Sequence, residues 1–329
     1  MSFSKILKNG KFLNSLLIFL CIYVIFLFSK ETKKEIRNYK HIINLSKNFR
    51  TDFTVDTTAT LPYVSGSTLI LYSDYIYDDH VKNVDQSIEQ MKPGDVILVK
   101  IDLIDEFFTK IFIKLTKPFI LITHQGDYST DIKHAKYLND SKLLVWFGQN
   151  PAFTHPKFIP MPIGFENTFW HPEKINFIRK VKTNELIPWH ERKYLLYLNF
   201  NSGTNPGSRE YLNNFLKNFP NVLISGRVNY ATYLKHLENS KYVLCPRGHG
   251  LDTHRFYETV LMGSIPVVEN STLYPIQKET SVLVLNSFRN LTTKILENPQ
   301  KYVNNLKFSK EILFMDYWWK KVEKIRKDF

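Results

Sequence analysis

Short continuous apolar runs recur along much of the chain and alternate with stretches of helical periodicity. The first set of runs lies in residues 68–164 and reads TLILY, DVILVK, FILITH, LLVWF and FIPMPIG. Segments between the runs, such as DEFFTKIFIKL, repeat apolar residues at helical spacing. Apolar runs without polar alternation are typical of strands that are buried on both faces. The pattern therefore predicts a parallel sheet covered by helices on both sides.

A charged stretch, residues 173–192, interrupts this pattern, and a second set of apolar runs follows it in residues 194–286. These runs read YLLYLNF, NVLISG, YVLC, IPVV and VLVLN, and the chain ends in the helix-like segment SKEILFMDYWWKKVEKIRKDF. We therefore predict two α/β domains, residues 61–180 and residues 190–329, the second with a closing helix. In open α/β sheets ligands bind beyond the carboxyl ends of the strands, so the loops at those ends are the candidates for chemistry.

The N-terminal segment is apolar over residues 12–28, which read FLNSLLIFLCIYVIFLF. This length reaches the lower limit for a helix that spans a bilayer. No small-residue cleavage pattern follows it, so we predict an uncleaved signal anchor at residues 12–29. The interpretation gives a short cytoplasmic tail at 1–11, a stem at 30–60, and folded domains on the lumenal side of the Golgi or ER membrane. The lysines after the anchor do not favour this orientation, but large C-terminal domains translocate largely regardless of flanking charge.

Charge and cysteine content narrow the classes of partner. The net charge of +13 reflects either a lysine-rich composition or a role in attracting anions. The basic residues are scattered and show no finger or knuckle spacing, so we expect no nucleic-acid partner. Cys21 and Cys245 lie in separate apolar runs, which predicts no disulfide. No Cys/His cluster has the spacing of metal ligands, so we expect no metal.

The loop CPRGHG after the third strand-like run of the second domain is the clearest chemical feature. Its proline ends the strand because it has no N–H to donate. Gly248 and Gly250 flank His249 and permit backbone conformations that are closed to other residues, as well as close approach of a ligand. Arg247 is suited to gripping a diphosphate with two parallel N–H bonds. The alternative is a tight turn in which Arg247 pairs with a nearby carboxylate.

A helix is predicted to begin near His254, directly after this loop. Asp252 or Thr253 is suited to cap it, and its N-terminus would direct N–H groups toward the loop. Within the helix, Arg255 and Glu258 are three residues apart. Either they form a salt bridge, or Glu258 faces the cleft and accepts hydrogen bonds from two ribose hydroxyls.

Two further loops carry candidate residues. The turn NFNSGTNPGSRE leads from a strand into a helix, and its Arg209 either binds a phosphate or lies in solvent. In the first domain, ITHQGDYS ends a strand with His124 and Asp127, both of which have the chemistry of a general base. The alternatives are that His124 is a satisfied core residue and that Asp127 caps a helix starting near Thr130.

The segment CPRGHGLDTHRFYETVLMGSIPVV resembles the C-terminal signature of exostosin-family (GT47-like) glycosyltransferases. THQGDYS, WFGQNP, PIGFENTFWHPE and LNFNSGTNPGSRE are similar to other stretches of that family. The resemblance implies a GT-B fold, in which two Rossmann-like α/β halves face a cleft. It also implies transfer with inversion from a nucleotide-sugar donor, without a metal or another cofactor, to a glycan or glycoprotein acceptor. Donor-site positions by this resemblance are Arg247, Gly248, Gly250, Thr253, Arg255 and Glu258, and His249 and Arg209 complete the predicted donor site.

The donor is expected in the second domain, so the catalytic base is expected across the cleft, in the first. Asp127 is the first choice, because a carboxylate is ionised at lumenal pH without tuning, and His124 is the second. We expect a UDP-linked donor. Two alternatives remain: a fucosyltransferase-like GT-B enzyme, and a catalytically silent glycan-binding protein of the same fold.

Overall fold

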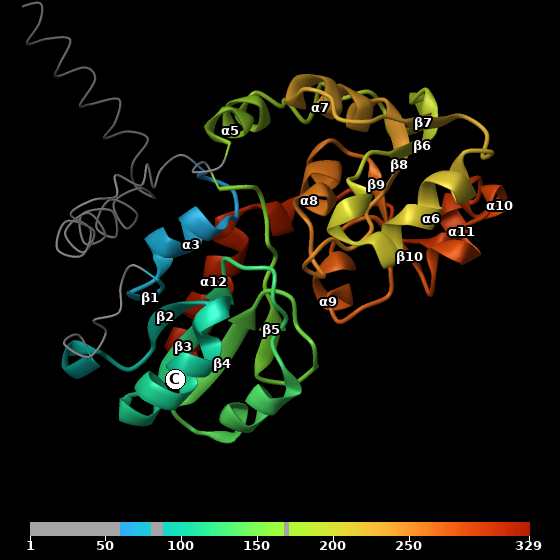
Figure 1. Ribbon diagram of the computed structural model, residues 1–329. Coiled ribbons are helices and arrows are strands. Elements are labelled where there is room, and N and C mark those ends of the chain that lie inside the picture. The colour runs from blue at the N-terminus through green and yellow to red at the C-terminus, as the bar shows by residue number, and fades with distance from the viewer. Residues whose placement is uncertain (1–59, 80–87, 168–170) are drawn as a thin grey trace, which may run out of the picture. The chain divides into compact units, whose positions relative to one another are not determined.

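The computed structural model describes residues 60–79, 88–167 and 171–329 (Figure 1). The chain divides into a unit of residues 1–54 and a compact unit of residues 55–329, and every described residue belongs to the second unit. The predicted tail, the signal anchor and almost all of the stem lie outside the described residues. Within those that are described, no helix has the length and apolar character needed to cross a membrane.

The first sheet has five parallel strands, which are ordered as they occur along the chain. They are β1 Tyr75–Tyr77, β2 Asp95–Lys100, β3 Phe119–His124, β4 Leu143–Gly148 and β5 Phe158–Pro160. All residues of β3 are buried, as expected of a continuous apolar run within a covered sheet. The strand β5 is shorter than the run FIPMPIG predicts, because Pro162 has no N–H with which to continue the ladder.

The run TLILY forms a helix, α3 Gly66–Tyr72, so its prediction as a strand is wrong. The side chain of Ser65 caps this helix by accepting a hydrogen bond from the Thr68 N–H at 3.1 Å. Most of the helix is buried, so its residues are apolar on nearly every side. A short buried helix and a buried strand have the same apolar pattern, which is why periodicity did not separate them.

The helical segment that the periodicity predicts in residues 105–115 is confirmed. The segment DEFFTKIFIKL begins as α4 Ile104–Glu106 and continues through a π turn and a 3₁₀ turn to Lys114. It packs on one face of the sheet, where Phe107 and Phe108 share a core with alternate strand residues such as Ile97. A 3₁₀ helix at Ile132–Asn139 and α5 Pro172–Arg179 complete this half.

The second sheet has six strands in the order β11-β10-β9-β8-β6-β7, parallel except for the pair of β10 and β11. The strands are β6 Tyr194–Leu198, β7 Val222–Ile224, β8 Ser240–Leu244, β9 Ile265–Glu269, β10 Val282–Leu285 and β11 Val303–Asn304. From β6 the chain passes to β7 on one side and then to β8 on the other. The topological switch point, where ligands bind in such sheets, is therefore at the carboxyl ends of β6 and β8.

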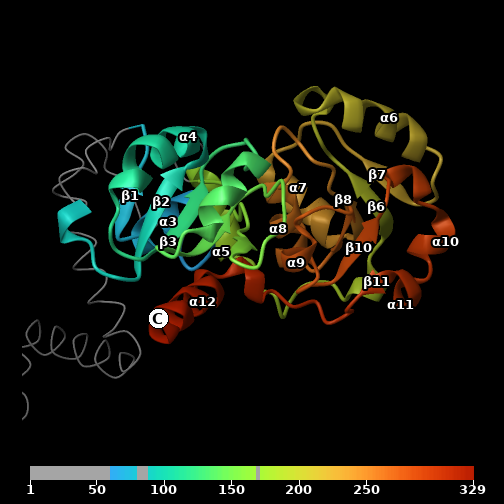
Figure 2. The ribbon, with the colours of Figure 1, turned by 90° about the horizontal axis from the view of Figure 1, so that it is seen from below.

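Helices cover both faces of this sheet (Figure 2). The helices that follow β6 are α6 Pro206–Leu216, α7 Tyr230–Glu238, α8 His254–Leu261, α9 Tyr274–Gln277, α10 Thr293–Leu296 and α11 Pro299–Tyr302, and the chain closes with α12 Met315–Asp328, which packs elsewhere. Alternate residues of β8 face opposite layers: Tyr242 and Leu244 share a core with α6, whereas Val243 shares one with α7 and α8.

The closing helix α12 packs against the first half of the chain. The Arg326 Nε–H donates to the Gly94 carbonyl at 2.9 Å, and the rings of Trp319 and Tyr72 lie 5.0 Å apart. Trp318 belongs to a core that also contains residues of both sheets. The last helix thus ties the end of the chain to the strands near its beginning, which sequence periodicity alone does not predict.

Candidate active site

The loops at the switch point of the second sheet are held together by Arg209. This residue of α6 is 6% exposed. Its Nε–H donates to the Arg247 carbonyl at 2.8 Å, and its Nη2 donates to the Pro246 carbonyl at 2.9 Å. Its Nη1 donates to the Asn201 carbonyl and to Thr204 Oγ1. Four of the five N–H groups of Arg209 are therefore used within these loops, and Arg209 fixes the conformation of the Arg247 loop. One N–H group remains for the predicted role of Arg209 in binding a phosphate.

The Arg247 loop presents its polar side chains outward and buries its glycines. Arg247 and His249 are exposed, whereas Gly248 and Gly250 are buried. Neither glycine has a positive φ, so the prediction that they supply unusual backbone conformations is wrong. They supply space: a Cβ on Gly250 would lie 2.8 Å from Asn150 Nδ2, and one on Gly248 would lie 3.3 Å from an Arg209 nitrogen.

The N-terminus of α8 follows this loop without a side-chain cap. Thr253 is the N-cap residue, but its side chain makes no capping hydrogen bond. The carboxylate of Asp252 accepts from the Thr253 N–H at 2.9 Å rather than from the first turn of the helix. The expected capping by either residue is therefore wrong. An uncapped helix N-terminus keeps N–H donors and a positive dipole end available to an anion.

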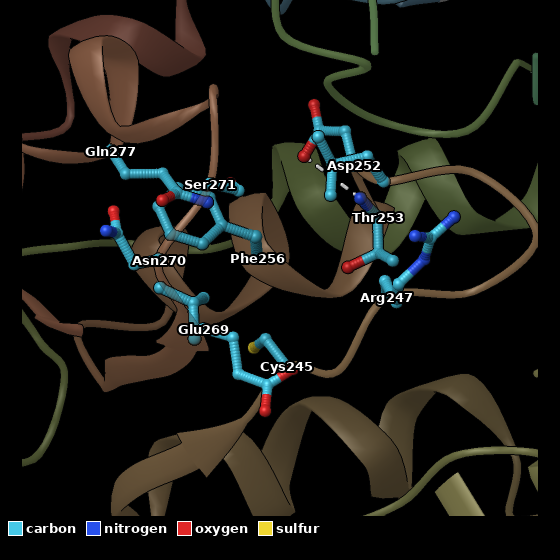
Figure 3. A pocket seen from close by; sticks show the side chains of 11 residues that line it. Cys245, Arg247, Asp252, Thr253, Phe256, Glu269, Asn270, Ser271 and Gln277 are labelled. Atoms are coloured by element: carbon cyan, nitrogen blue, oxygen red, sulfur yellow. Dashed lines mark hydrogen bonds between the residues drawn. The ribbon is translucent and has the colours of Figure 1, made fainter. Parts of the chain in front are cut away.

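A pocket opens beside this helix end, at the carboxyl ends of β8 and β9 (Figure 3). Arg247 and Thr253 lie on one side of it, and Asn270, Ser271 and Gln277 lie on the other. The Oε1 atom of Gln277 is buried and has no hydrogen-bond partner. The sequence analysis did not name these last three residues as site residues, because no pattern around them indicates a ligand site.

Cys245 also lines this pocket. Its thiol is buried and free, and burial raises its pKa to about 12. A thiol of that pKa stays protonated, which fits the interpretation of Cys245 as a small core residue rather than a nucleophile.

Glu258 is buried against α7 rather than paired with Arg255. Its Oε1 accepts from the Tyr230 hydroxyl at 2.8 Å, and its Oε2 accepts from the Tyr233 hydroxyl at 2.9 Å. Burial, and then the charge of Glu258, raise the pKa of both tyrosines well above the ordinary value, so both hydroxyls remain donors. No ion pair joins Arg255 to Glu258 among the described residues, so the salt-bridge alternative is wrong. The sequence analysis missed Tyr230 and Tyr233, although their spacing places them on one face of a helix.

Among the residues that the structure describes, none forms an ion pair with the guanidinium of Arg255. Its Nη1 is buried without a hydrogen-bond partner, and the group lies over the Tyr233 ring, 5.7 Å from the centroid. Burial, and then the positive charge of Arg255, lower the pKa of Arg209 to about 10. Two arginines with like charge therefore influence each other at the switch point, where an anion would relieve their repulsion.

The two residues predicted as catalytic bases have opposite environments. His124 is 2% exposed, donates from Nε2 to the Pro162 carbonyl at 3.1 Å, and has no partner for its Nδ1. Burial lowers its pKa to about 4. The side chain of Asp127 is 65% exposed, and its Oδ2 lies 3.7 Å from His249 Nδ1. The helix after this loop is capped by Asp131, so the alternative that Asp127 is a cap is wrong.

The loops of the two sheets meet around Asn150. Its Nδ2 donates to the Asp127 carbonyl at 3.3 Å, and its Oδ1 accepts from the Asp252 N–H at 2.8 Å. The structure therefore brings Asp127 next to His249, and the loop of the first sheet next to the Arg247 loop. His124 and Glu258, in contrast, are buried in the elements that support these loops.

Comparison with known proteins gives one family match. Residues 179–328 match the model of a family described as the RXYLT1 C-terminal domain. No curated protein matches the chain.

Several solved structures are also similar. AviGT4, a glycosyltransferase involved in avilamycin A biosynthesis, is 11% identical, with a TM-score of 0.39 over 75% of this chain and 77% of that chain. The UDP-GlcNAc 2-epimerase from Methanocaldococcus jannaschii is 11% identical, with a TM-score of 0.35 over 75% and 80%. Sucrose-phosphate synthase from Thermosynechococcus elongatus is 11% identical, with a TM-score of 0.35 over 70% and 73%. These scores are too low to carry an argument, so the assignment depends on the family match. The resemblance to exostosin-type glycosyltransferases is confirmed for the C-terminal part of the chain, where residues 179–328 match the RXYLT1 C-terminal domain.

Proposed function

We propose that the protein is an inverting glycosyltransferase that takes a UDP-linked sugar as donor and a glycan or glycoprotein as acceptor. The observation that carries this proposal is the cationic switch point. Arg255 has a buried Nη1 without a hydrogen-bond partner, Arg247 is exposed in the loop before α8, and α8 begins without a side-chain cap. Guanidinium groups and a helix N-terminus are the usual protein ligands of a diphosphate.

Donor binding in this proposal uses both sides of α8. Arg247, Arg255 and the first N–H groups of the helix bind the diphosphate, with Thr253 beside them. Glu258 binds the ribose hydroxyls through lone pairs that the two tyrosine hydroxyls leave available, because each carboxylate oxygen has two acceptor sites. Tyr230 and Tyr233 act by holding the carboxylate in one orientation.

The proposed base is Asp127. An acceptor hydroxyl attacks the anomeric carbon of the donor, the bond from that carbon to the diphosphate oxygen breaks, and the hydroxyl proton passes to the carboxylate. His249, 3.7 Å from Asp127, orients this carboxylate at the entrance of the site. His124 is less suited, because a group with a pKa of about 4 is a weak base near neutral pH.

The arginines and the helix end stabilise the leaving diphosphate, so the proposal requires neither a metal ion nor another cofactor. It retains the predicted placement of the chain: a single-pass type II protein of the Golgi or ER membrane, anchored by residues 12–29, without a nucleic-acid partner.

The test is a thermal-shift and turnover screen of the purified full-length chain with UDP, GDP and a panel of their sugar conjugates. A nucleotide that binds the folded state raises the melting temperature by mass action. We expect UDP to stabilise the wild type and to lose most of that effect in Arg255→Ala, whereas Lys320→Ala, an exposed cation on α12, responds like the wild type. Stabilisation by GDP-fucose alone would favour a fucosyltransferase-like enzyme. Binding without hydrolysis or transfer would favour a silent glycan-binding protein.

A further inference from the structure

Three titratable side chains each hold one backbone group in three consecutive residues just after β5. The His124 Nε2–H donates to the Pro162 carbonyl at 3.1 Å, and the His254 Nδ1–H donates to the Gly164 carbonyl at 2.7 Å. Between them, the Ile163 N–H donates to Asp252 Oδ2 at 2.8 Å. One of these side chains belongs to the first sheet, and the other two belong to the start of α8 and the residue before its cap. The segment after β5 is therefore fixed from both halves of the chain.

Asp252 is the centre of this arrangement. It is 5% exposed, and its Oδ2 also accepts from the Tyr257 hydroxyl at 2.6 Å. Its Oδ1 accepts from the Thr253 N–H, and its own N–H donates to Asn150 Oδ1. One residue thus bonds the loops after β4 and β5 of the first sheet as well as the first two turns of α8.

We propose that Asp252 is a positioning residue that couples the donor-binding end of α8 to the strand-end loops of the first sheet. Thr253 and Arg255, on either side of His254, contact the donor under the proposed function, and the inference rests on that function for the identity of the ligand. Asn150, which Asp252 contacts, also holds the backbone of the Asp127 loop. A ligand that orders the start of α8 therefore also fixes the loop that carries the proposed base.

The buried surroundings of Asp252 strengthen the hydrogen bonds that make up this coupling. A buried hydrogen-bond network is strong when it is fully satisfied, and it is costly to break when one partner is lost. The charged and titratable groups that face Asp252 are Tyr257 and His254 of α8. His124 of β3 interacts electrostatically with His254. None of these groups forms a close ion pair with the carboxylate among the described residues, so the hydrogen bonds carry the contact.

The experiment compares the wild type, Asp252→Asn and Tyr257→Phe as purified full-length chains by hydrogen exchange, nucleotide binding and turnover. Asp252→Asn keeps the size of the side chain but replaces one acceptor oxygen with an NH₂ group; replacing Oδ2 takes the acceptor from Ile163 and Tyr257. Residues 160–163 report the result cleanly, because Pro160 and Pro162 have no amide hydrogen. Their signal comes from Met161, which bonds the Gly148 carbonyl, and from Ile163.

We expect Ile163 in Asp252→Asn to exchange at least about tenfold faster than in the wild type. We also expect UDP affinity to stay within about threefold and kcat to fall at least about tenfold, with little change in the donor KM. Tyr257→Phe keeps the ring and the bond from Ile163 to Asp252 but removes one bond to α8, so its exchange at Ile163 and its kcat should change less than in Asp252→Asn. In the wild type, saturating UDP should slow exchange at Ile163, a measurement that needs no variant and serves if Asp252→Asn does not fold.

The outcomes separate this inference from the proposed function. If UDP and its sugar conjugates do not bind the wild type, the proposed function fails and the positioning role fails with it. If UDP binds but leaves exchange at Ile163 unchanged, the coupling is wrong while the proposed function stands. If exchange accelerates in Asp252→Asn and kcat does not change, Asp252 is structural only.

Discussion

The strand-end loops of the two sheets differ in how far they are organised before any ligand binds. In the second sheet, the Arg247 loop is fixed by two hydrogen bonds from Arg209, which also bonds the neighbouring loop at Asn201 and Thr204, and by two buried glycines. In the first sheet, Asn150 holds the loop after β3 by its backbone, and the exposed Asp127 carboxylate has His249 as its one ion-pair neighbour among the described residues. A rigid cationic loop favours one donor geometry, because the entropy of ordering the loop is lost during folding rather than on binding. An exposed carboxylate leaves room for an acceptor, so the two loops suit the two halves of a transfer reaction.

The largest expected effect is on turnover, when the exposed carboxylate of Asp127 is removed. Asp127→Asn removes the proposed base and should lower kcat about a hundredfold or more, the magnitude typical of lost general-base catalysis. UDP affinity should not change, because the donor loop does not depend on the Asp127 side chain. Steady-state turnover and calorimetric titration of the same preparation measure both quantities. Normal turnover in this variant would move the base elsewhere, and His124→Ala would then be the next variant to assay.

The second prediction concerns the organised Arg247 loop of the second sheet and its affinity for the donor. Arg247→Ala should weaken donor binding by about 2–3 kcal/mol, the value of a hydrogen bond to a charged group, while the fold stays intact because the side chain is exposed. Arg247→Lys should recover only part of the loss, since an ammonium lacks the planar fork of two N–H groups. The dissociation constant for UDP tests this directly. An unchanged constant in the alanine variant would remove Arg247 from the diphosphate site.

A third prediction concerns pH, because the junction between the loops holds two buried groups whose pKa values move in opposite directions. Burial lowers the pKa of His124 from 6.5 to about 4, so on acidification from 6.5 to 4 the unfolded chain binds this proton first and stability falls. Burial raises the pKa of Asp252 from 3.8 to about 6, so over pH 6 to 4 the folded chain binds this proton first and stability rises. In the wild type the two contributions oppose each other between about pH 4 and 6.

Asp252→Asn removes one of these opposing contributions. Relative to the wild type, its free energy of unfolding should fall by about 1.4 kcal/mol for each pH unit between pH 6 and 4. Urea unfolding of both proteins at pH 4, 5, 6 and 7 gives the difference, in which the titration of all other groups cancels. Parallel curves over this range would show that the Asp252 carboxyl does not titrate there.

The fourth prediction concerns Glu258, which lies on α8, the helix that follows the Arg247 loop, and is hydrogen-bonded to α7. If it binds the ribose, Glu258→Gln should weaken UDP binding about tenfold, because one acceptor oxygen becomes a donor. Tyr230→Phe is the matched control: it removes one hydrogen bond to Glu258 but keeps both carboxylate oxygens, so UDP binding should change less. Equal losses of melting temperature in both variants with no loss of UDP binding would make the cluster purely structural.

Sequence patterns predicted the two sheets and the position of the Arg247 loop, because long apolar runs and glycine-proline turns are local signals. They failed for TLILY, where a short buried helix has the apolar content of a strand. They also missed what long-range contacts decide. Arg209 and Arg247 are 38 residues apart, and nothing near either residue indicates that one holds the backbone of the other. Likewise, Asp252 was interpreted as a helix cap, since its contact with Ile163 joins residues 89 positions apart.

The smallest expected effect separates the two glycines of the Arg247 loop. A Cβ on Gly250 would meet Asn150 Nδ2 at 2.8 Å and the Asp127 carbonyl oxygen at 3.2 Å, so Gly250→Ala presses on the contact between the two loops. We expect a loss of about 1 kcal/mol in stability, at the low end for overpacking, together with lower turnover. A Cβ on Gly248 would meet Arg209 Nη2 at 3.3 Å, the far end of a long side chain, so Gly248→Ala should cost less. Because neither position has a positive φ, the difference between the two variants measures packing alone. If Gly248→Ala lowers stability and turnover more than Gly250→Ala does, close packing between the loops of the two sheets does not determine either quantity.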